Sequence, residues 1–95
     1  MFFVYILLSL KDNKKYIGFT KDLDRRLQEH FTGSCKSTKH RRPLKLIYKE
    51  SFSTKSKAML REKFLKSGKG REFIKAILII ELHIKIIRRQ YGIII

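Results

Sequence analysis

The chain has 95 residues, enough for one domain with one modest hydrophobic core and too few for two. Hydrophobic residues make up 43% of it, so its composition does not indicate disorder. Lys and Arg number 23 against 8 Asp and Glu, which gives a formal charge of +15. Such a charge is better explained by binding to nucleic acid than by a surface that is charged only for solubility.

The first predicted elements form a β-hairpin. Residues 2–8 are β-branched, aromatic or aliphatic, which favours a buried strand. A signal peptide is a poorer interpretation, because no basic residue precedes the apolar stretch and no small-residue cleavage site follows it. Asp12 and Asn13 lie in a turn signal at Lys11–Lys14, and a second strand is expected from Lys15 to Phe19.

A helix is predicted to follow the hairpin. Thr20 to Asp22 can cap its start, and from Leu23 the apolar residues recur at helical spacing. Three of them share one arc that should face the sheet: Leu23, Leu27 and Phe31. Arg26 and His30 lie at the edge of this arc, whereas Arg25 falls elsewhere. The period therefore places Arg26 beside the buried face and Arg25 in solvent.

The second half of the chain begins with a polar, basic loop over residues 32–43, followed by a third strand at Leu44–Tyr48. A second helix should begin at Ser53 or Thr54 and run to about Ser67, with Gly68 as its stop. Beyond Phe73 the pattern fits helix and strand equally; we predict helix at its start and leave the last few residues unassigned. The expected class is α+β, a small three-stranded antiparallel sheet flanked by helices in the order β-β-α-β-α, then a C-terminal helix or tail.

Glu62 stands out on the second helix. It shares a face with Ala58 and Leu65 through i+4 and i+3 spacing. An acid beside small and apolar neighbours is either functional or ion-paired, and Arg61 and Lys66 are the nearby bases.

These motifs together resemble the GIY-YIG nuclease superfamily, and among its members the small stand-alone bacterial proteins similar to the nicking domain of the excision-repair incision subunit. Tyr16, Ile17 and Gly18 match the second half of that name, with Arg26 and His30 following at the family's spacing. Residues 3–5 stand where the family has Gly-Ile-Tyr, and there Tyr5 is kept while Phe and Val replace Gly and Ile. Arg61 to Lys63 and Gly68 to Arg71 resemble the metal-binding helix and the segment after it.

The resemblance implies a nuclease domain over residues 1–75 and an apolar, basic tail over 76–95 that is not a separate domain. It implies five catalytic residues: Tyr5, Tyr16, Arg26, His30 and Glu62. Glu62 would be the protein ligand of one divalent ion, Mg²⁺ or Mn²⁺. A tyrosine would activate water with His30 as a proton relay, and Arg26 would contact the scissile phosphate. Which tyrosine is the base stays open.

Each of these residues also has an ordinary structural interpretation. The tyrosines could be aromatics on a sheet face, His30 could pack against the sheet, and Arg26 could pair with Asp22 or Glu29. The basic loop is expected to track phosphates without reading bases, through five residues: Lys36, Lys39, His40, Arg41 and Arg42.

The predicted function is a metal-dependent endonuclease that hydrolyses DNA phosphodiester bonds in repair or recombination. The alternatives are a nucleic-acid-binding protein with the nuclease fold and little cleavage activity, or a basic RNA-binding factor with an accidental motif match; RNA also remains open as a substrate.

The lone Cys35 excludes an internal disulfide and favours a reducing compartment, the cytoplasm. No membrane span is expected. The apolar tail either completes the core or contacts a second copy or another protein.

Overall fold

A computed structural model of the chain describes residues 1–91 and confirms the α+β class. The strands are β1 (Phe2–Ser9), β2 (Lys15–Thr20) and β3 (Leu44–Phe52). The helices are α1 (Leu23–Thr32), α2 (Lys55–Leu65) and α3 (Gly68–Tyr91), with a short 3₁₀ turn, η1 (Lys39–Arg41), before β3. The order is therefore β-β-α-β-α-α, and within the described residues the C-terminal segment is a helix.

The three strands form one antiparallel sheet in the order β2-β1-β3. The turn between β1 and β2 is held by Ser9, whose hydroxyl oxygen accepts from the backbone N–H groups of Lys11 and Asp12 at 3.2 Å each. Asn13 adopts a positive φ of 60°, which Asn tolerates better than most residues. The predicted turn at Lys11–Lys14 is thus confirmed.

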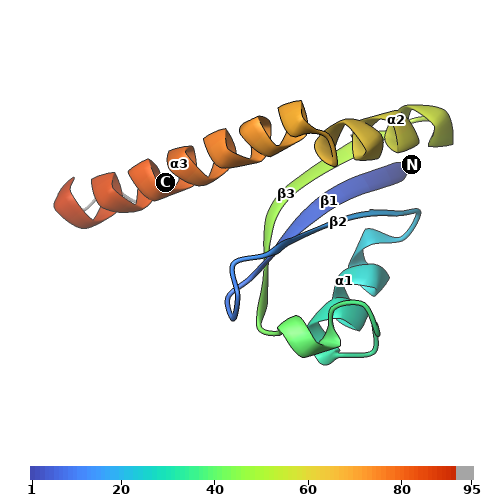
Figure 1. Ribbon diagram of the computed structural model, residues 1–95, viewed down its shortest axis with the longest axis horizontal. Helices are drawn as coiled ribbons and strands as arrows, with labels where there is room; N and C mark the ends of the chain where they lie inside the picture. The colour runs from blue at the N-terminus through green and yellow to red at the C-terminus, as the bar shows by residue number, and fades with distance from the viewer. Residues whose placement is uncertain (92–95) are drawn as a thin grey trace.

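The strand β1 is covered on both faces, by different helices. Val4 and Ile6 pack with Ala58, Leu65 and Ile74 of α2 and α3. The alternate residues Tyr5 and Leu7 face the other side and pack with Leu23 and Leu27 of α1. Figure 1 shows the result, with α2 and α3 on one side of the sheet and α1 on the other. Alternate side chains of β1 are therefore packed by different helices.

Three details differ from the sequence predictions. Phe31 is 40% exposed rather than buried, because the last turn of α1 directs the fully buried His30 toward the sheet instead. The strand β3 extends to Phe52, beyond the predicted end at Tyr48. Gly68 does not stop α2 but begins α3: α2 ends at Leu65 with Lys66 in a right-handed conformation, and the Ser67 hydroxyl accepts from Gly70 N–H at the start of α3.

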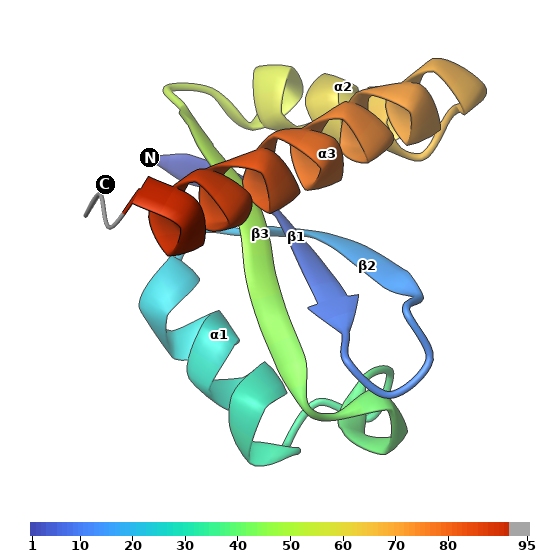
Figure 2. The same cartoon turned by 90° about the vertical axis from the view of Figure 1, so that its left-hand side faces the viewer.

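The helix α3 crosses the sheet and projects beyond it (Figure 2). Its inner face completes the core through Ile74, with Ile77 and Leu78 partly buried. Its outer face leaves several large aliphatic side chains exposed: Ile79, Ile80, Leu82, Ile86 and Ile87. In residues 1–91 no helix combines the length and apolarity that crossing a membrane requires. The unassigned end of the tail, residues 92–95, lies outside the described residues.

Candidate active site

Tyr5 and Gly18 face each other across the β1–β2 ladder. A Cβ added at Gly18 would lie 2.3 Å from both Cζ and the hydroxyl oxygen of Tyr5. The phenol ring of Tyr5 therefore lies directly over Gly18, in space that any other residue would fill. The glycine of the Tyr-Ile-Gly motif is what allows the Tyr5 side chain to cross β2.

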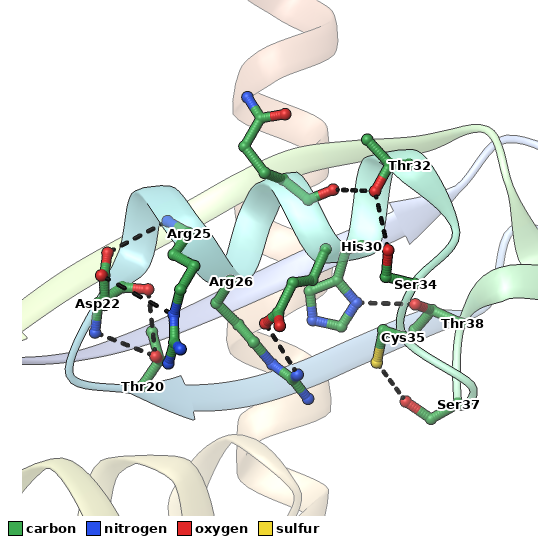
Figure 3. A network of polar contacts seen from close by, with 12 residues as sticks. Thr20, Asp22, Arg25, Arg26, His30, Thr32, Ser34, Cys35, Ser37 and Thr38 are labelled. Atoms are coloured by element: carbon green, nitrogen blue, oxygen red, sulfur yellow. Dashed lines mark hydrogen bonds and ion pairs between the residues drawn. The ribbon is translucent and has the colours of Figure 1, made fainter.

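The hydroxyl of Tyr5 reaches the imidazole of His30 on α1. Its oxygen lies 2.8 Å from Nε2 of His30, and Nδ1 of His30 lies 2.7 Å from Oγ1 of Thr38. All three side chains are fully buried. The segment 33–38 that follows α1 thus closes over His30, as the contact between His30 and Thr38 shows in Figure 3.

Arg26 also interacts with the hydroxyl of Tyr5, and a guanidinium only donates hydrogen bonds, so the Tyr5 oxygen is the acceptor in that interaction. Both ring nitrogens of His30 are engaged, Nε2 with Tyr5 and Nδ1 with Thr38. The phenol and the hydroxyl can each donate or accept, so both contacts suit a neutral imidazole. The His30 ring is therefore held from both sides in a site closed to water.

Tyr16 completes an aromatic cluster on the same face of the sheet. Its ring centroid lies 5.0 Å from that of His30 and 6.3 Å from that of Tyr5. Unlike Tyr5, which is fully buried, Tyr16 is partly exposed. The two tyrosines are therefore close together but differ in their access to water.

Arg26 lies at the edge of this cluster, as the helical period predicted. Nη1 of Arg26 is 3.3 Å from Oε1 of Glu29, and about a third of the Arg26 side chain is exposed. Arg25 instead turns to solvent, with 72% of its side chain exposed and Asp22 as its ion-pair partner (Figure 3). Burial lowers the pKa of Arg26, but its contacts with Tyr5 and Glu29 raise it by more, so the guanidinium stays charged.

The cluster shifts the pKa of several groups. Burial raises the pKa of Tyr5 to about 12, with the nearby Arg26 acting in the opposite direction. Burial and the positive charge of Arg26 lower the pKa of His30. For Cys35, burial raises the pKa, but hydrogen bonds from Ser37 and Thr38 and the charge of Arg26 lower it by more. At neutral pH Tyr5 is therefore protonated and His30 neutral.

Glu62 stands apart from these residues. It lies on α2, on the opposite side of the sheet from α1, and its Oε2 is 3.7 Å from Nζ of Lys66. Arg61, the other base considered for it, pairs with Glu50 instead at 3.2 Å. About a quarter of the Glu62 side chain is exposed. The structure brings Tyr5, Tyr16, Arg26 and His30 together, whereas Glu62 lies on the helix that packs against the other face of the sheet.

The predicted basic loop lies beside the β1–β2 turn. The Ser9 hydroxyl donates to the Arg41 carbonyl at 2.7 Å, and Nζ of Lys11 donates to the His40 carbonyl at 3.3 Å. Arg41 is partly buried, while four other side chains of the loop are exposed: Lys36, Lys39, His40 and Arg42. The charged groups of this loop thus face solvent, where a polyanion can reach them.

Sequence reasoning missed two residues that shape the cluster. Gly18 enters the sequence analysis only as part of a motif, although a glycine inside an expected strand is itself a signal that another group approaches the backbone closely. Thr38 had no signal, because its contact with His30 depends on how the loop after α1 folds back.

Comparison with known proteins identifies one family model and several relatives that share one family name. A family model described as the GIY-YIG catalytic domain matches residues 1–75. A UPF0213 protein of Staphylococcus haemolyticus is 42% identical over 76 residues, covering 79% of this chain and 92% of the relative. The UPF0213 protein YazA of Bacillus subtilis is 48% identical over 63 residues, covering 65% of this chain and 64% of the relative.

A solved structure supports the same fold. The solution NMR structure of a UPF0213 protein from Bacillus halodurans has a TM-score of 0.50 and 36% sequence identity, and the match covers 81% of this chain and 85% of that one. None of these names states an activity or a substrate.

Proposed function

Because the chain belongs to the GIY-YIG catalytic-domain family, we propose that it is a metal-dependent endonuclease that hydrolyses phosphodiester bonds in DNA. The observation that carries the proposal is the cluster of Tyr5, Tyr16, Arg26 and His30 on one face of the sheet. This cluster combines a charged guanidinium, a water-accessible phenol, and a neutral imidazole in contact with a second phenol. Packing of a hydrophobic core does not require such a combination, whereas a catalytic site does.

Tyr16 is the better candidate for the base that activates water. Tyr5 has no exposed surface, its hydroxyl is engaged with His30, and burial raises its pKa to about 12. Tyr16 is partly exposed and lies beside Arg26, so water can reach its hydroxyl next to the group that would bind the phosphate. In this assignment Tyr16 first releases its own proton to solvent and then takes one from the attacking water, and Tyr5 and His30 hold the Tyr16 ring and Arg26 in position.

Arg26 is placed to bind the phosphate that is attacked. Its guanidinium stays charged, and its exposed portion can present two N–H donors to two phosphate oxygens. The contact with Glu29 holds the side chain by its Nη1 atom. Negative charge that builds up on the phosphate during attack would be stabilised here.

Glu62 is the residue that would hold the divalent ion of this family, Mg²⁺ or Mn²⁺. In residues 1–91 no group of three His, Cys, Asp or Glu side chains is arranged to hold a metal, so the donor set fits an ion that keeps most of its water ligands. The Glu62–Lys66 pair is long and Lys66 is half exposed, so it is a weak interaction that an ion can replace. When bound, such an ion would neutralise charge on the phosphate and the leaving oxygen.

The position of Glu62 favours one alternative. Because α2 covers the other face of the sheet and Glu62 pairs with Lys66, the protein could bind nucleic acid with the nuclease fold and cleave little. In either case residues 1–75 would be the functional domain and 76–95 a tail continuous with it through α3.

A cleavage assay separates the two. Labelled linear, flapped and branched DNA, with RNA of the same sequence, would be incubated with Mg²⁺, Mn²⁺ or EDTA. We expect metal-dependent cleavage that Glu62→Ala and Arg26→Ala abolish and that the matched controls Glu72→Ala and Arg25→Ala leave intact. A preference for flapped or branched DNA would support a role in repair or recombination. Cleavage that persists in EDTA or in Glu62→Ala would refute the mechanism, and binding without cleavage would favour the alternative.

A further inference from the structure

A cavity of about 420 Å³ lies on the face of the sheet away from the tyrosines, between β2, the corner of α2 and α3, and the 3₁₀ turn η1. Its volume falls within the range of small-ligand sites. Six basic side chains from four separate segments line it: Lys14, Lys15, Arg41, Lys66, Arg71 and Lys75. The remaining lining is aliphatic and comes from three residues: Ile17, Leu65 and Ile74.

The charge around this cavity is unbalanced. No carboxylate lines it. Two acidic side chains lie near it: Glu62, which is 3.7 Å from Lys66, and Asp12, which interacts with Lys14 and Arg41. Six cations that share one cavity with so few acids repel one another, which costs stability unless an anion binds.

The start of α3 adds to this positive field. The N-terminal end of a helix favours acidic side chains, yet the first turn of this 24-residue helix has none and carries Lys69 instead, with Arg71 just after it. Gly70 allows α2 and α3 to meet closely at this corner, because a Cβ there would lie 2.2 Å from the carbonyl oxygen of Phe64. The start of α3 thus adds cationic side chains beside the cavity and no acidic one.

The cavity is joined to the candidate active site by β2, which is an edge strand. Tyr16 and Ile17 are adjacent on β2 and point to opposite faces, Tyr16 into the aromatic cluster and Ile17 into the cavity. Arg41 also connects the two, because it lines the cavity and belongs to the 3₁₀ turn that follows Thr38, the partner of His30. A strand that leaves Tyr16 can therefore reach the cavity by passing the edge of β2.

We propose that this cavity binds an unpaired nucleotide of the substrate strand, with its phosphate among the six cations and its sugar or base against the aliphatic floor. The inference rests on the proposed function, since it takes the strand at Tyr16 to be the substrate. A base in a duplex cannot enter, because its apolar faces are covered by stacking and its edge by pairing. The cavity therefore selects single-stranded segments next to the cleavage site.

Binding measurements in EDTA test this inference without requiring cleavage. A fluorescent oligothymidylate would be titrated against the wild type, Arg71→Ala/Lys75→Ala, and the charge-matched control Lys55→Ala/Lys57→Ala at the far end of α2. We expect the cavity variant to bind the single strand about tenfold more weakly. Its slope of log affinity against log salt should fall by about 0.7, the contribution of the one single-strand phosphate that the cavity holds. The control variant should keep most of the single-strand affinity and most of the salt dependence.

A second variant and two competitors complete the test. Lys14→Glu/Lys15→Glu reverses charge on the exposed hairpin side of the cavity and should weaken single-strand binding more than duplex binding. Equal losses in cavity and control variants, or equal losses for single strand and duplex, would overturn the proposal. Inorganic phosphate and thymidine monophosphate are the two competitors. If either displaces the oligonucleotide at a concentration equal to that of the oligonucleotide's own phosphates at half-saturation, the cavity does not recognise a strand and the proposal is overturned. A protein that shows the selective loss but never cleaves DNA would refute the nuclease proposal and leave this one standing.

Discussion

The hydroxyl of Tyr5 and Nε2 of His30 lie 2.8 Å apart in a fully buried site. Each residue satisfies a polar atom of the other that water cannot reach, and Nδ1 of His30 is satisfied in turn by Thr38. The contact therefore has two consequences that can be measured separately, one for stability and one for the placement of Arg26 and Tyr16.

Replacing Tyr5 by Phe should destabilise the protein more than the same change at Tyr16. Tyr5→Phe leaves Nε2 of His30 buried without a partner, which costs about 1–3 kcal/mol. Tyr16 is partly exposed, so water can replace its hydroxyl, and Tyr16→Phe should change stability by less than about 0.5 kcal/mol while abolishing cleavage. Urea denaturation measures the first difference. Equal destabilisation of the two variants would contradict the assignment of Tyr5 as the buried, positioning tyrosine.

Gly18→Ala should be poorly tolerated. The added methyl would lie 2.3 Å from the Tyr5 ring, so the phenol must move away from His30, and overpacking of this kind costs about 1–3 kcal/mol. Gly68→Ala is the matched control, because no atom lies within 4 Å of its added Cβ. Thermal or urea unfolding of both variants gives the comparison, and a Gly18→Ala protein as stable as the control would show that Tyr5 does not need this space.

Stability should fall in mild acid in a way that depends on His30. Its pKa is lowered in the folded protein by burial and by Arg26, so the unfolded chain binds the proton more readily. The stability contribution of neutral His30 is complete above the unfolded pKa of about 6.5 and is lost as pH falls toward the lower folded value. The difference in unfolding free energy between wild type and His30→Gln should therefore shrink below pH 6.5. A difference that stays constant down to pH 5 would mean that His30 is not held neutral.

Arg26→Lys should impair cleavage although it keeps the charge. Lys offers no planar fork for two phosphate oxygens, and loss of one donor to a transition state reduces the rate by about 10²–10³. The same change at Arg25, which is exposed and lies one position along α1, should leave the rate nearly unchanged. Single-turnover rates with both variants measure this, and similar rates would remove Arg26 from the phosphate site.

The sequence predicted well whatever depends on local periodicity. Apolar composition and turn chemistry located the hairpin, and the 3.6-residue period distinguished Arg26 from Arg25 and placed His30 at the edge of the buried face. The same period wrongly extended the buried stripe to Phe31, because it does not show which residue of the last turn the sheet will meet.

Features that depend on long-range placement were not accessible. Nothing in the spacing of Glu62 indicates which face of the sheet α2 covers, and its separation from the tyrosines becomes visible only in the packed fold. The cavity is a similar case, since its six cations come from segments that are far apart in the sequence.

The central position of β1 has a consequence for the order of folding. Its pairing with β2 closes only the short turn at Lys11–Lys14, whereas its pairing with β3 must wait for α1 and the loop after it. Closing a short loop costs less entropy, so we expect the β1–β2 ladder, Tyr5 and Gly18 included, to form first. Pulsed hydrogen exchange should show the amides of that ladder protected before those of β3, and simultaneous protection would contradict this order. During synthesis, the strand that carries Tyr5 would then have its first partner before half of the chain has been made.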